Sequence, residues 1–380
     1  MTFFTSESVS EGHPDKIADQ ISDAVLDSIL SKDKNCAVAC ETMIKNSLII
    51  VSGEIKTDLW VDLEKIVYEV IKNIGYDDIS KGLNADNLSI INLISKQSKE
   101  IHDSVFDKSD NCIGAGDQGI MFGYACDETE SYMPAPIYYA NKLLVNLAKK
   151  RKSGEINWLR PDAKSQVTVQ YNDGKVLRID SVLISTQHKE NISQKEIRDI
   201  IINDVIKKSI PAKYLDEKTN YIINPSGSFI IGGPYADCGL TGRKVIVDAY
   251  GGYARHGGGA FSGKDPSKVD RSASYMARYI AKNIVAAKLA SKCEVQLSYG
   301  IGISKPLSIY VNTFGTSRYL DDHIIKIIKE NFNLSPRGII DTLNLKNISY
   351  LESAAYGHFG REGDNFTWEK LDMVEKLRVL

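Results

Sequence analysis

Cysteine is scarce in this chain and is never closely paired. The 380 residues include six cysteines, and no two of them have Cys-x-x-Cys spacing. Disulfide frameworks and zinc sites depend on such paired cysteines, so the sequence indicates neither, and we expect the thiols to be reduced.

Long apolar runs are also absent. No stretch approaches the roughly 18 consecutive apolar residues that a membrane helix needs. The first residues, Met1–Ser8, hold no basic segment followed by an apolar one, as a secretory signal would. We therefore expect a cytoplasmic protein without a membrane partner.

An excess of one charge is lacking too. The chain has 47 Lys and Arg against 49 Asp and Glu, a net charge of −2, and a pI of about 6.3. Binders of nucleic acid or anionic membrane carry a basic excess, so we expect neither as the main partner. With 43% hydrophobic and 25% charged residues, a chain of this length fits a soluble enzyme of more than one domain.

One pattern of secondary structure recurs three times along the chain. Each time, two runs with strand periodicity are followed by an amphipathic helical pattern. Three such units predict an α+β protein built from three similar domains. The predicted strand pairs are 36–44 with 47–55, 166–171 with 176–186, and 294–303 with 307–314; the predicted helices are 58–74, 194–208 and 321–332.

A basic, glycine-rich stretch at 251–271 is the strongest local signal. It contains six glycines, and the wider segment 241–278 has seven Lys or Arg against three Asp, although the whole chain is nearly neutral. Glycine lets successive backbone N–H groups approach an anion while nearby cations add charge, so the stretch is typical of a polyphosphate site. The alternative is a flexible surface loop with solvated charges.

Two glycine motifs resemble standard nucleotide-binding signatures but lack the required context. Gly114–Gly119 satisfies G-x-G-x-x-G, yet polar residues precede it and 120–125 has the pattern of a strand, whereas a dinucleotide fold needs a strand before and a helix after. Gly258–Asp265 is one residue short of a P-loop and lacks its Mg²⁺-binding hydroxyl. The sequence therefore predicts neither fold, although Lys264 can still contact phosphate.

The N-terminal region predicts a helix that begins at Pro14. His13 and Asp15 then lie at its positive end. Either residue can simply cap the helix. A helix N-terminus with an imidazole and a carboxylate also suits a phosphate group and a hard metal ion. The local pattern alone leaves both interpretations open.

Four motifs together closely resemble one enzyme family. Phe4–Lys16, Gly114–Gly119, Trp158–Val167 and Gly257–Asp265 are similar to the methionine adenosyltransferases, also called S-adenosylmethionine synthetases, of bacterial type, and the likeness extends to Ala354–Glu362. It implies an enzyme that joins ATP and L-methionine into S-adenosylmethionine and then cleaves the triphosphate into pyrophosphate and phosphate. It also implies three α+β domains about a pseudo-threefold axis.

The implied chemistry fits the residues that are present. A thioether sulfur that attacks C5′ of ATP has no proton to lose, so no Ser-His-Asp or Cys-His system is needed, and none is evident. Fixed cations must instead stabilise the leaving triphosphate. By resemblance, the polyphosphate contacts and catalytic groups are His13, which would sit at the scissile oxygen, with Lys164, Arg243, Lys244 and Lys264; other ATP-site residues are Ala260, Asp162, Phe229 and Asp237.

The resemblance also implies metal and methionine sites. Family members use Mg²⁺, a pair of ions per site, and a single K⁺. The Mg²⁺ ligand would be Asp15, with Asp270 a weaker candidate, and Glu41 would bind K⁺. Methionine would contact Glu54, Gln97, Lys268 and Asp237, and Asp117 would be a further acidic residue of the pocket.

The strand pattern makes a specific prediction about two of these carboxylates. If Lys45 and Asn46 form a two-residue turn, Glu41 pairs with Ile50 and shares a face with Glu54, roughly 13 Å away along the strand at about 3.3 Å per residue. One sheet face could then serve two subsites. The alternative is a pair of solvated strand carboxylates.

One position departs from the bacterial pattern. Ser228 stands where relatives usually have arginine, which removes a cation beside Phe229. A non-catalytic nucleotide-binding regulator, or another ATP-dependent transferase, therefore remains an alternative function.

The resemblance finally predicts the organisation of the chain. The expected domains are 1–98, 112–230 and 232–372, with a mobile gate loop at 97–112. The expected assembly is a homodimer or a dimer of dimers whose active sites lie between subunits.

Overall fold

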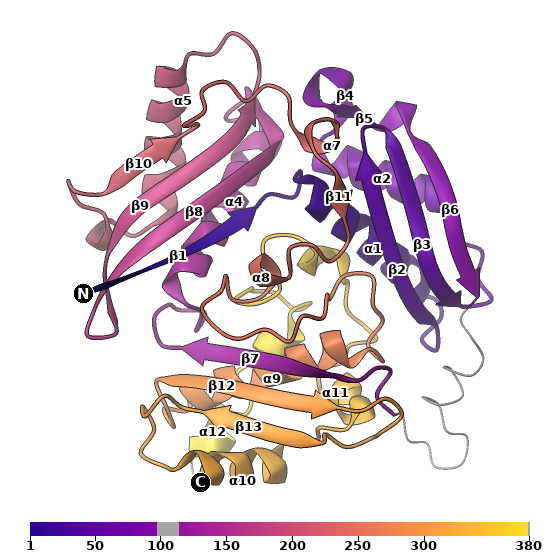
Figure 1. Ribbon diagram of the computed structural model, residues 1–380, viewed down its shortest axis with the longest axis vertical. Helices are drawn as coiled ribbons and strands as arrows, with labels where there is room; N and C mark the ends of the chain where they lie inside the picture. Colours follow the sequence, from indigo (N-terminus) through magenta and orange to yellow (C-terminus); the bar gives the residue numbers. More distant parts are fainter. Residues whose placement is uncertain (97–113, 379–380) are drawn as a thin grey trace.

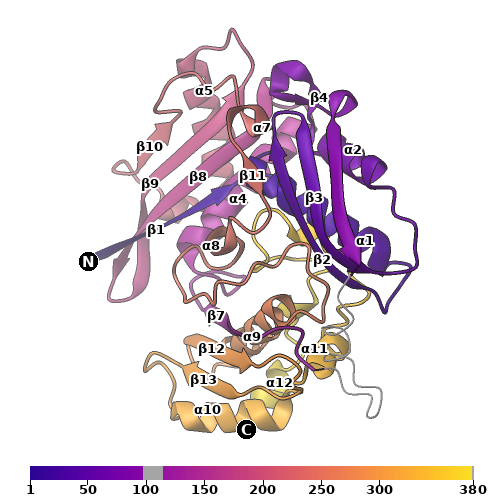
Figure 2. The same ribbon diagram turned by 45° about the vertical axis from the view of Figure 1, so that its right-hand side comes forward.

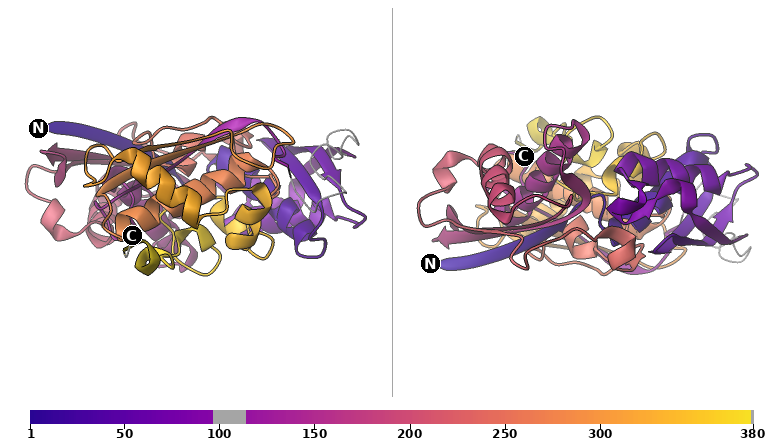
Figure 3. Two further views of the ribbon diagram at one scale, coloured as in Figure 1. Left: turned by 90° about the horizontal axis from the view of Figure 1, so that it is seen from below. Right: turned by 90° about the horizontal axis from the view of Figure 1, so that it is seen from above.

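Three β-sheets with helices packed against them make up the molecule. The computed structural model describes residues 1–96 and 114–378. The sheets are spread around a common centre (Figures 1 and 2). Seen from below and from above, the molecule is flat, because the sheets lie side by side (Figure 3). This architecture confirms the predicted α+β class with three similar units.

The first sheet carries the N-terminal hairpin. Its strand order is β11-β2-β3-β6, and α1 packs on β2, β11 and α2. The inner face is apolar and the outer face is largely exposed. The bounds are β2 Ala37–Lys45, β3 Leu48–Lys56, β6 Ser89–Lys96 and β11 Gly239–Leu240, with α1 Pro14–Leu30 and α2 Leu63–Ile74, followed by the short strands β4 Asp77–Asp78 and β5 Leu83–Asn84.

The second sheet has the order β1-β8-β9-β10 and packs on α4. Its long hairpin is the second predicted strand pair, and the predicted helix 194–208 is present but contains a π-helical turn. The bounds are β1 Thr2–Val9, β8 Leu159–Asn172, β9 Lys175–His188 and β10 Asn220–Ile223, with α4 Ala135–Lys152, α5 Gln194–Ile200, the π turn Ile201–Ile206, α6 Lys207–Ser209 and, before β11, α7 Gly233–Ala236.

The third sheet has the order β13-β12-β7 and packs on α9. The strand predicted after the first glycine motif is β7, so the motif leads into a strand rather than a helix, as expected. The bounds are β7 Gly119–Cys126, β12 Lys292–Tyr299 and β13 Ser308–Asn312, with α8 Val245–Asp248, α9 Val269–Ala286, α10 Asp321–Asn331, α11 Pro336–Thr342 and α12 Val374–Arg378.

Each sheet also includes a strand from a distant part of the chain. β1 pairs with β8, β11 pairs with β2, and β7 pairs with β12. Segments far apart in the sequence therefore lie side by side in each sheet (Figure 1). The linear domain bounds given above stay a prediction.

The β2–β3 turn lies one residue later than predicted. Lys45 pairs with Leu48, so Asn46 and Ser47 form the turn. Asn46 adopts the left-handed conformation, with φ of 52°, which Asn tolerates well. Its N–H also donates to the carbonyl of Pro234 at 2.8 Å. A tertiary contact therefore fixes the turn that the local sequence left ambiguous.

Helix α2 is shorter at its start than the predicted 58–74. It begins at Leu63 because the carboxylate of Asp62 accepts the N–H of Lys65 at 3.0 Å and so caps the helix. It ends as predicted at Gly75, which adopts φ of 107°.

Buried charge joins α9 to the C-terminal segment. The guanidinium of Arg278 is fully buried and donates to the carboxylate of Glu369 at 3.0 and 3.2 Å, and to the carbonyl of Tyr124 on β7 at 2.7 Å. Lys282 donates to the same carboxylate at 2.7 Å. Because each charge is desolvated, each depends on the other two.

We predict that Glu369→Gln lowers the free energy of unfolding by about 3 to 5 kcal/mol, because it leaves two buried cations without a counter-charge. The control is Glu375→Gln, which breaks the exposed pair with Arg378 and should cost about 0 to 1 kcal/mol. Urea unfolding of both variants measures the difference. Equal losses would contradict this account of the core.

Candidate active site

A histidine caps the N-terminus of α1, and Pro14 takes the first helical position, as predicted. The Nδ1 atom of His13 accepts the N–H of Asp15 at 3.2 Å, so the ring proton lies on Nε2. Burial, followed by the charges of Lys244 and Lys164, lowers the pKa of His13 to about 3. His13 is therefore a neutral imidazole near neutral pH and can donate a hydrogen bond through Nε2.

Asp15 does not cap the helix, because the cap that the sequence allowed for either residue belongs to His13. Its Oδ1 accepts the N–H of Leu240 at 3.0 Å, and its Oδ2 forms an ion pair with Lys244. Burial acts to raise the pKa of Asp15, but Lys244 and the Leu240 N–H outweigh it, and the pKa is lowered. The carboxylate therefore stays ionised near neutral pH and faces the segment that follows β11.

Segment 239–248 lies along the first two turns of α1. The N–H of Gly242 donates to Asp19 Oδ1 at 2.9 Å. The ammonium of Lys16 bridges Asp19 Oδ2 at 2.8 Å and Asp248 Oδ1 at 2.5 Å, and all three charged side chains are buried. These contacts fix the segment at both ends.

Two of the predicted polyphosphate cations follow Gly242 directly. Arg243 is exposed and forms no ion pair or hydrogen bond through its side chain in the described part of the chain. Lys244 is paired with the α1 carboxylate just described. A third cation, Lys164, is exposed on β8 and is close enough to lower the pKa of His13. Lys164 and Lys244 therefore both lie close enough to His13 to affect its charge.

Loop 257–265 carries the fourth cation. The N–H of Gly263 donates to Asp23 Oδ1 at 2.8 Å, which attaches the loop to α1 two turns beyond Asp15. The next residue, Lys264, pairs with Asp270 at 2.5 Å. Asp270 therefore lies with Lys264, whereas Asp15 lies with Lys244.

The remaining residues of this loop region lie nearby. A Cβ added to Gly242 would be 2.6 Å from Cβ of Ala260, so Ala260 lies beside segment 239–248. Lys268 pairs with the buried Asp265 at 2.7 Å.

Asp162 and Phe229 form a distinct part of the site. His188 holds the backbone of Phe229 with two hydrogen bonds. The Nε2 atom of His188 accepts the N–H of Phe229 at 3.0 Å, and the backbone N–H of His188 donates to the carbonyl of Phe229 at 3.0 Å. Gly232 lies between the ring and the carboxylate, because a Cβ there would be 2.9 Å from Cε2 of Phe229 and 3.2 Å from Oδ2 of Asp162.

The Asp162 carboxylate is only half satisfied. Its Oδ2 accepts the N–H of Gly233 at 2.8 Å, while its buried Oδ1 has no partner among the described residues. Burial raises the pKa of Asp162 to about 6, with a further contribution from Asp237. An unpaired buried oxygen costs free energy unless a ligand supplies a donor.

Three other predicted residues are exposed. Asp237 contributes to the pKa of both His13 and Asp162, so it lies near both parts of the site. Among the described residues, the Asp117 carboxylate accepts one hydrogen bond, from the backbone N–H of Gln118. Ser228 is solvent-exposed immediately before the ring-bearing Phe229.

The predicted pairing of Glu41 is wrong, because the shifted turn changes the register. Glu41 pairs with Ser52 instead of Ile50. It still shares the exposed outer face of the sheet with Glu54, now roughly 7 Å away along the strand. The two carboxylates are therefore closer than predicted.

Two predictions lie outside the described residues: Gln97 as a methionine contact, and 97–112 as a gate. In the described part of the chain no three His, Cys, Asp or Glu side chains gather as a metal-ligand cluster. Asp15, Asp270 and Glu41 therefore do not form such a cluster among the described residues.

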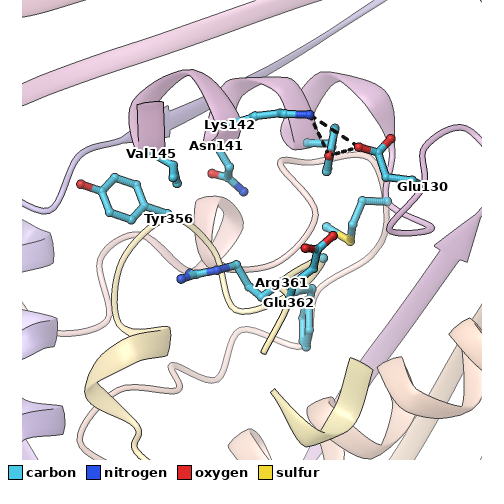
Figure 4. Close-up of a pocket in the computed structure, with 11 residues that line it drawn as sticks. Glu130, Asn141, Lys142, Val145, Tyr356, Arg361 and Glu362 are labelled. Atoms are coloured by element: carbon cyan, nitrogen blue, oxygen red, sulfur yellow. Dashed lines mark hydrogen bonds and ion pairs between the residues drawn. The ribbon is translucent and has the colours of Figure 1, made fainter. Parts of the chain in front are cut away.

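A pocket of about 330 Å³ lies away from these residues, between α4 and the C-terminal segment. Figure 4 shows Asn141 and Val145 from α4 on one side of the pocket and Tyr356 and Arg361 on the other, while Lys142 points to Glu130. None of the predicted site residues that the structure describes lines it.

The sequence interpretation missed Asp19 and Asp23. Both are fully buried and bind the loops that carry the predicted cations. A signal was present, since these residues continue the spacing of four from Asp15 along the predicted helix. Their partners could not be inferred, because they lie more than 200 residues away.

Comparison with protein-family models decides the family. The model of the S-adenosylmethionine synthetase N-terminal domain matches residues 1–99, that of the central domain matches 112–229, and that of the C-terminal domain matches 231–370. The chain belongs to the S-adenosylmethionine synthetase family.

The enzyme is therefore a methionine adenosyltransferase that synthesises S-adenosylmethionine, and its family implies ATP and methionine as substrates. Nothing in the family match points to the alternative of a regulator or another transferase. No helix in the described residues has the length and apolarity to cross a membrane.

We predict that Asp162→Asn changes the pH dependence of stability. The folded-state pKa of about 6 is above the ordinary value of 3.8. The wild type therefore loses stability relative to the variant as pH rises from about 4 through 6, and the difference then levels off. Urea unfolding of both proteins between pH 4 and pH 7.5 measures this. A difference that is independent of pH would show that Asp162 titrates normally.

Proposed function

We propose that His13, Lys164, Arg243, Lys244 and Lys264 bind the triphosphate of ATP while methionine sulfur attacks C5′. The support is the clustering of His13, Lys164 and Lys244 near the N-terminus of α1, together with the Arg243 guanidinium beside Lys244, which has no partner among the described residues. The leaving triphosphate gains charge at the C5′ oxygen in the transition state. Fixed cations and N–H donors stabilise that charge without reorganising.

His13 contributes a neutral donor in this proposal. Its Nδ1 is occupied by the Asp15 N–H, so Nε2–H points away from the helix and can donate to the oxygen that leaves C5′. A pKa of about 3 means that it does so without carrying a charge. The reaction needs no proton transfer, which suits a donor that stays neutral.

We assign the adenosine end to Asp162 and Phe229. The ring offers a flat apolar surface, and the unpaired Oδ1 of Asp162 can accept a donor of the nucleoside. Asp237 is near both this region and His13, since it contributes to both pKa shifts, and this suits contact with both substrates. Ser228 supplies only a hydroxyl at the edge of this site.

Metal binding fits the carboxylates of this chain. Mg²⁺ is usually held by one or two carboxylates together with substrate phosphates, so a dense ligand cluster in the free protein is not required. Asp15 and Asp270 each pair with a proposed phosphate-binding lysine, which suits a shared cation and phosphate site. We propose them as Mg²⁺ ligands and Glu41 as the K⁺ ligand; the ions would neutralise part of the triphosphate charge.

Methionine is assigned to the second group of residues. Glu54 would hold the amine, with Lys268, Gln97 and Asp237 completing the contacts. Glu54 and Glu41 share the outer face of β2 and β3, while loop 257–265 touches β2 through a bridge between Ala39 and Lys264. That contact links the proposed methionine and phosphate subsites.

We propose that two chains complete each site. Asp15 and Asp23 are eight residues apart, roughly 12 Å along α1, so Lys244 and Lys264 extend from separate positions. The outer face of the first sheet exposes Met43, Leu48, Ile91 and Leu93, an apolar surface suited to pairing with a second copy. In a homodimer, or in a dimer of dimers, Lys244 of one subunit and Lys264 of its partner would then lie in the same active site.

The test of this function is product analysis. Incubation with ATP, L-methionine, Mg²⁺ and K⁺ should yield S-adenosylmethionine with one phosphate and one pyrophosphate. Release of intact triphosphate would remove the proposed hydrolytic step, and ADP as the main product would contradict the assignment of the site.

We predict that Lys164→Ala and Lys264→Ala each lower kcat by about 10² to 10³, since each removes a fixed charge from the leaving triphosphate. Both side chains are partly exposed, so stability should change by less than about 1 kcal/mol. Lys326→Ala on the exposed surface of α10 is the matched control and should leave kcat unchanged. Folded variants with wild-type kcat would refute the charge roles.

We predict that Asp15→Asn raises the Mg²⁺ concentration needed for half-maximal activity and lowers kcat, because a neutral amide is a poorer Mg²⁺ ligand. The helix cap belongs to His13, so the helix end should remain capped. Mg²⁺ titrations of both proteins measure the effect. An unchanged Mg²⁺ dependence would leave Asp15 as a partner of Lys244 only.

A further inference from the structure

Four aspartates form a single stripe along α1. Asp15, Asp19, Asp23 and Asp27 are spaced by four residues and so lie on one face of the helix. Each accepts backbone N–H groups from a segment far away in sequence. The donors are Leu240 for Asp15, Gly242 for Asp19, Gly263 for Asp23, and Tyr350 with Leu351 for Asp27.

The two middle contacts have the same construction. Gly242 and Gly263 both adopt left-handed backbone, with φ of 78° and 79°, and each gives its N–H to a buried carboxylate. Each glycine directly precedes a proposed polyphosphate cation, Arg243 in one loop and Lys264 in the other. An anchored N–H therefore sets the point from which each cation extends.

Asp19 and Asp23, which anchor the two loops, are held rigidly because each is paired with a buried cation. Asp19 is paired with Lys16 at 2.8 Å, and Asp23 is bridged by both terminal nitrogens of Arg271 at 2.6 and 2.8 Å. All four side chains are buried. A desolvated pair of this kind has few alternative arrangements, since any movement leaves a charge unpaired.

We propose that Asp19 and Asp23 are positioning residues of the reaction: through Gly242 and Gly263 they hold the two cation loops at fixed places along α1. This rests on the proposed role of Arg243, Lys244 and Lys264 at the triphosphate. The aspartates do not touch substrate, and their effect passes through the backbone.

Fixed placement matters for this chemistry. Charge stabilisation requires donors that are already in place, and a displacement of about 1 Å can cost about 10² in rate. Loss of the Asp19 acceptor leaves the Gly242 N–H unpaired and frees the loop, so the cations reach the transition state less often in the productive geometry.

Asp27 provides a matched control on the same helix face. It accepts the N–H groups of Tyr350 and Leu351 at 2.8 and 3.0 Å and the hydroxyl of Ser349 at 2.7 Å. Its segment carries no proposed substrate contact. Asp27 is partly buried, and replacing it tests the effect of losing a carboxylate anchor of α1 on stability alone.

The experiment compares Asp19→Ala, Asp19→Asn and Asp27→Ala in the full-length enzyme. The readouts are kcat, KM for methionine, affinity for inorganic triphosphate by calorimetry, and the unfolding midpoint. We expect Asp19→Ala to lower kcat by about 10² and triphosphate affinity by about tenfold, with KM for methionine within about threefold. Asp27→Ala should lose stability but keep kcat within about threefold. Asp19→Asn keeps an acceptor oxygen and should recover most of the lost kcat.

If Asp19→Ala does not fold, the triple variant Lys16→Met/Asp19→Leu/Asp248→Leu replaces the whole buried charge triad by apolar groups while still removing the acceptor. A folded variant without the acceptor that keeps wild-type kcat and triphosphate affinity overturns the proposal, as does an Asp27→Ala variant that loses kcat equally.

Lys264→Ala and Arg243→Ala distinguish the proposed role of the cations at the triphosphate from the positioning of their loops by α1. If these variants keep full activity, the proposed triphosphate role fails. If they lose activity while Asp19→Ala does not, that role stands and the positioning by α1 fails. Asp23→Ala, with Asp23→Asn as the variant that keeps an acceptor, extends the same comparison to the second loop.

Discussion

The burial of charge on helix α1 is the constraint on which the rest of the structure depends. A buried carboxylate is costly unless its hydrogen-bonding capacity and its charge are both met. Asp19 and Asp23 meet this requirement with backbone N–H groups of two loops and with the cations Lys16 and Arg271. The loops must therefore close around the helix in one arrangement. That arrangement presents the proposed polyphosphate cations.

This constraint also relates the two halves of the proposed site. Segment 239–248 and loop 257–265 are attached to one rigid helix at different heights, so neither can move without breaking a buried pair. In a dimer with shared sites, the two loops of one chain would serve opposite active sites. Helix α1 would then set the geometry of both sites at once, while the exposed sheet faces supply the contact between subunits.

Local features of the fold could be predicted from the sequence, and contacts across the chain could not. Strand alternation and helical periodicity identified the three hairpins and the helices that follow them, because these depend on neighbouring residues. The turn at Asn46 was misplaced by one residue, since its backbone also bonds to Pro234. The motifs gave the residues around His13. The partners of Asp15 and Asp19 lie more than 200 residues away, beyond any local pattern.

A crystal structure with a non-hydrolysable ATP analogue and Mg²⁺ tests the central claim most directly. The account predicts triphosphate oxygens within hydrogen-bonding distance of Arg243 and Lys244 of one subunit and of Lys264 of the partner subunit. The backbone contacts of Gly242 and Gly263 to α1 should be unchanged. A triphosphate bound away from both loops, for example in the pocket beside Arg361, or loops detached from α1 in the complex, would contradict it.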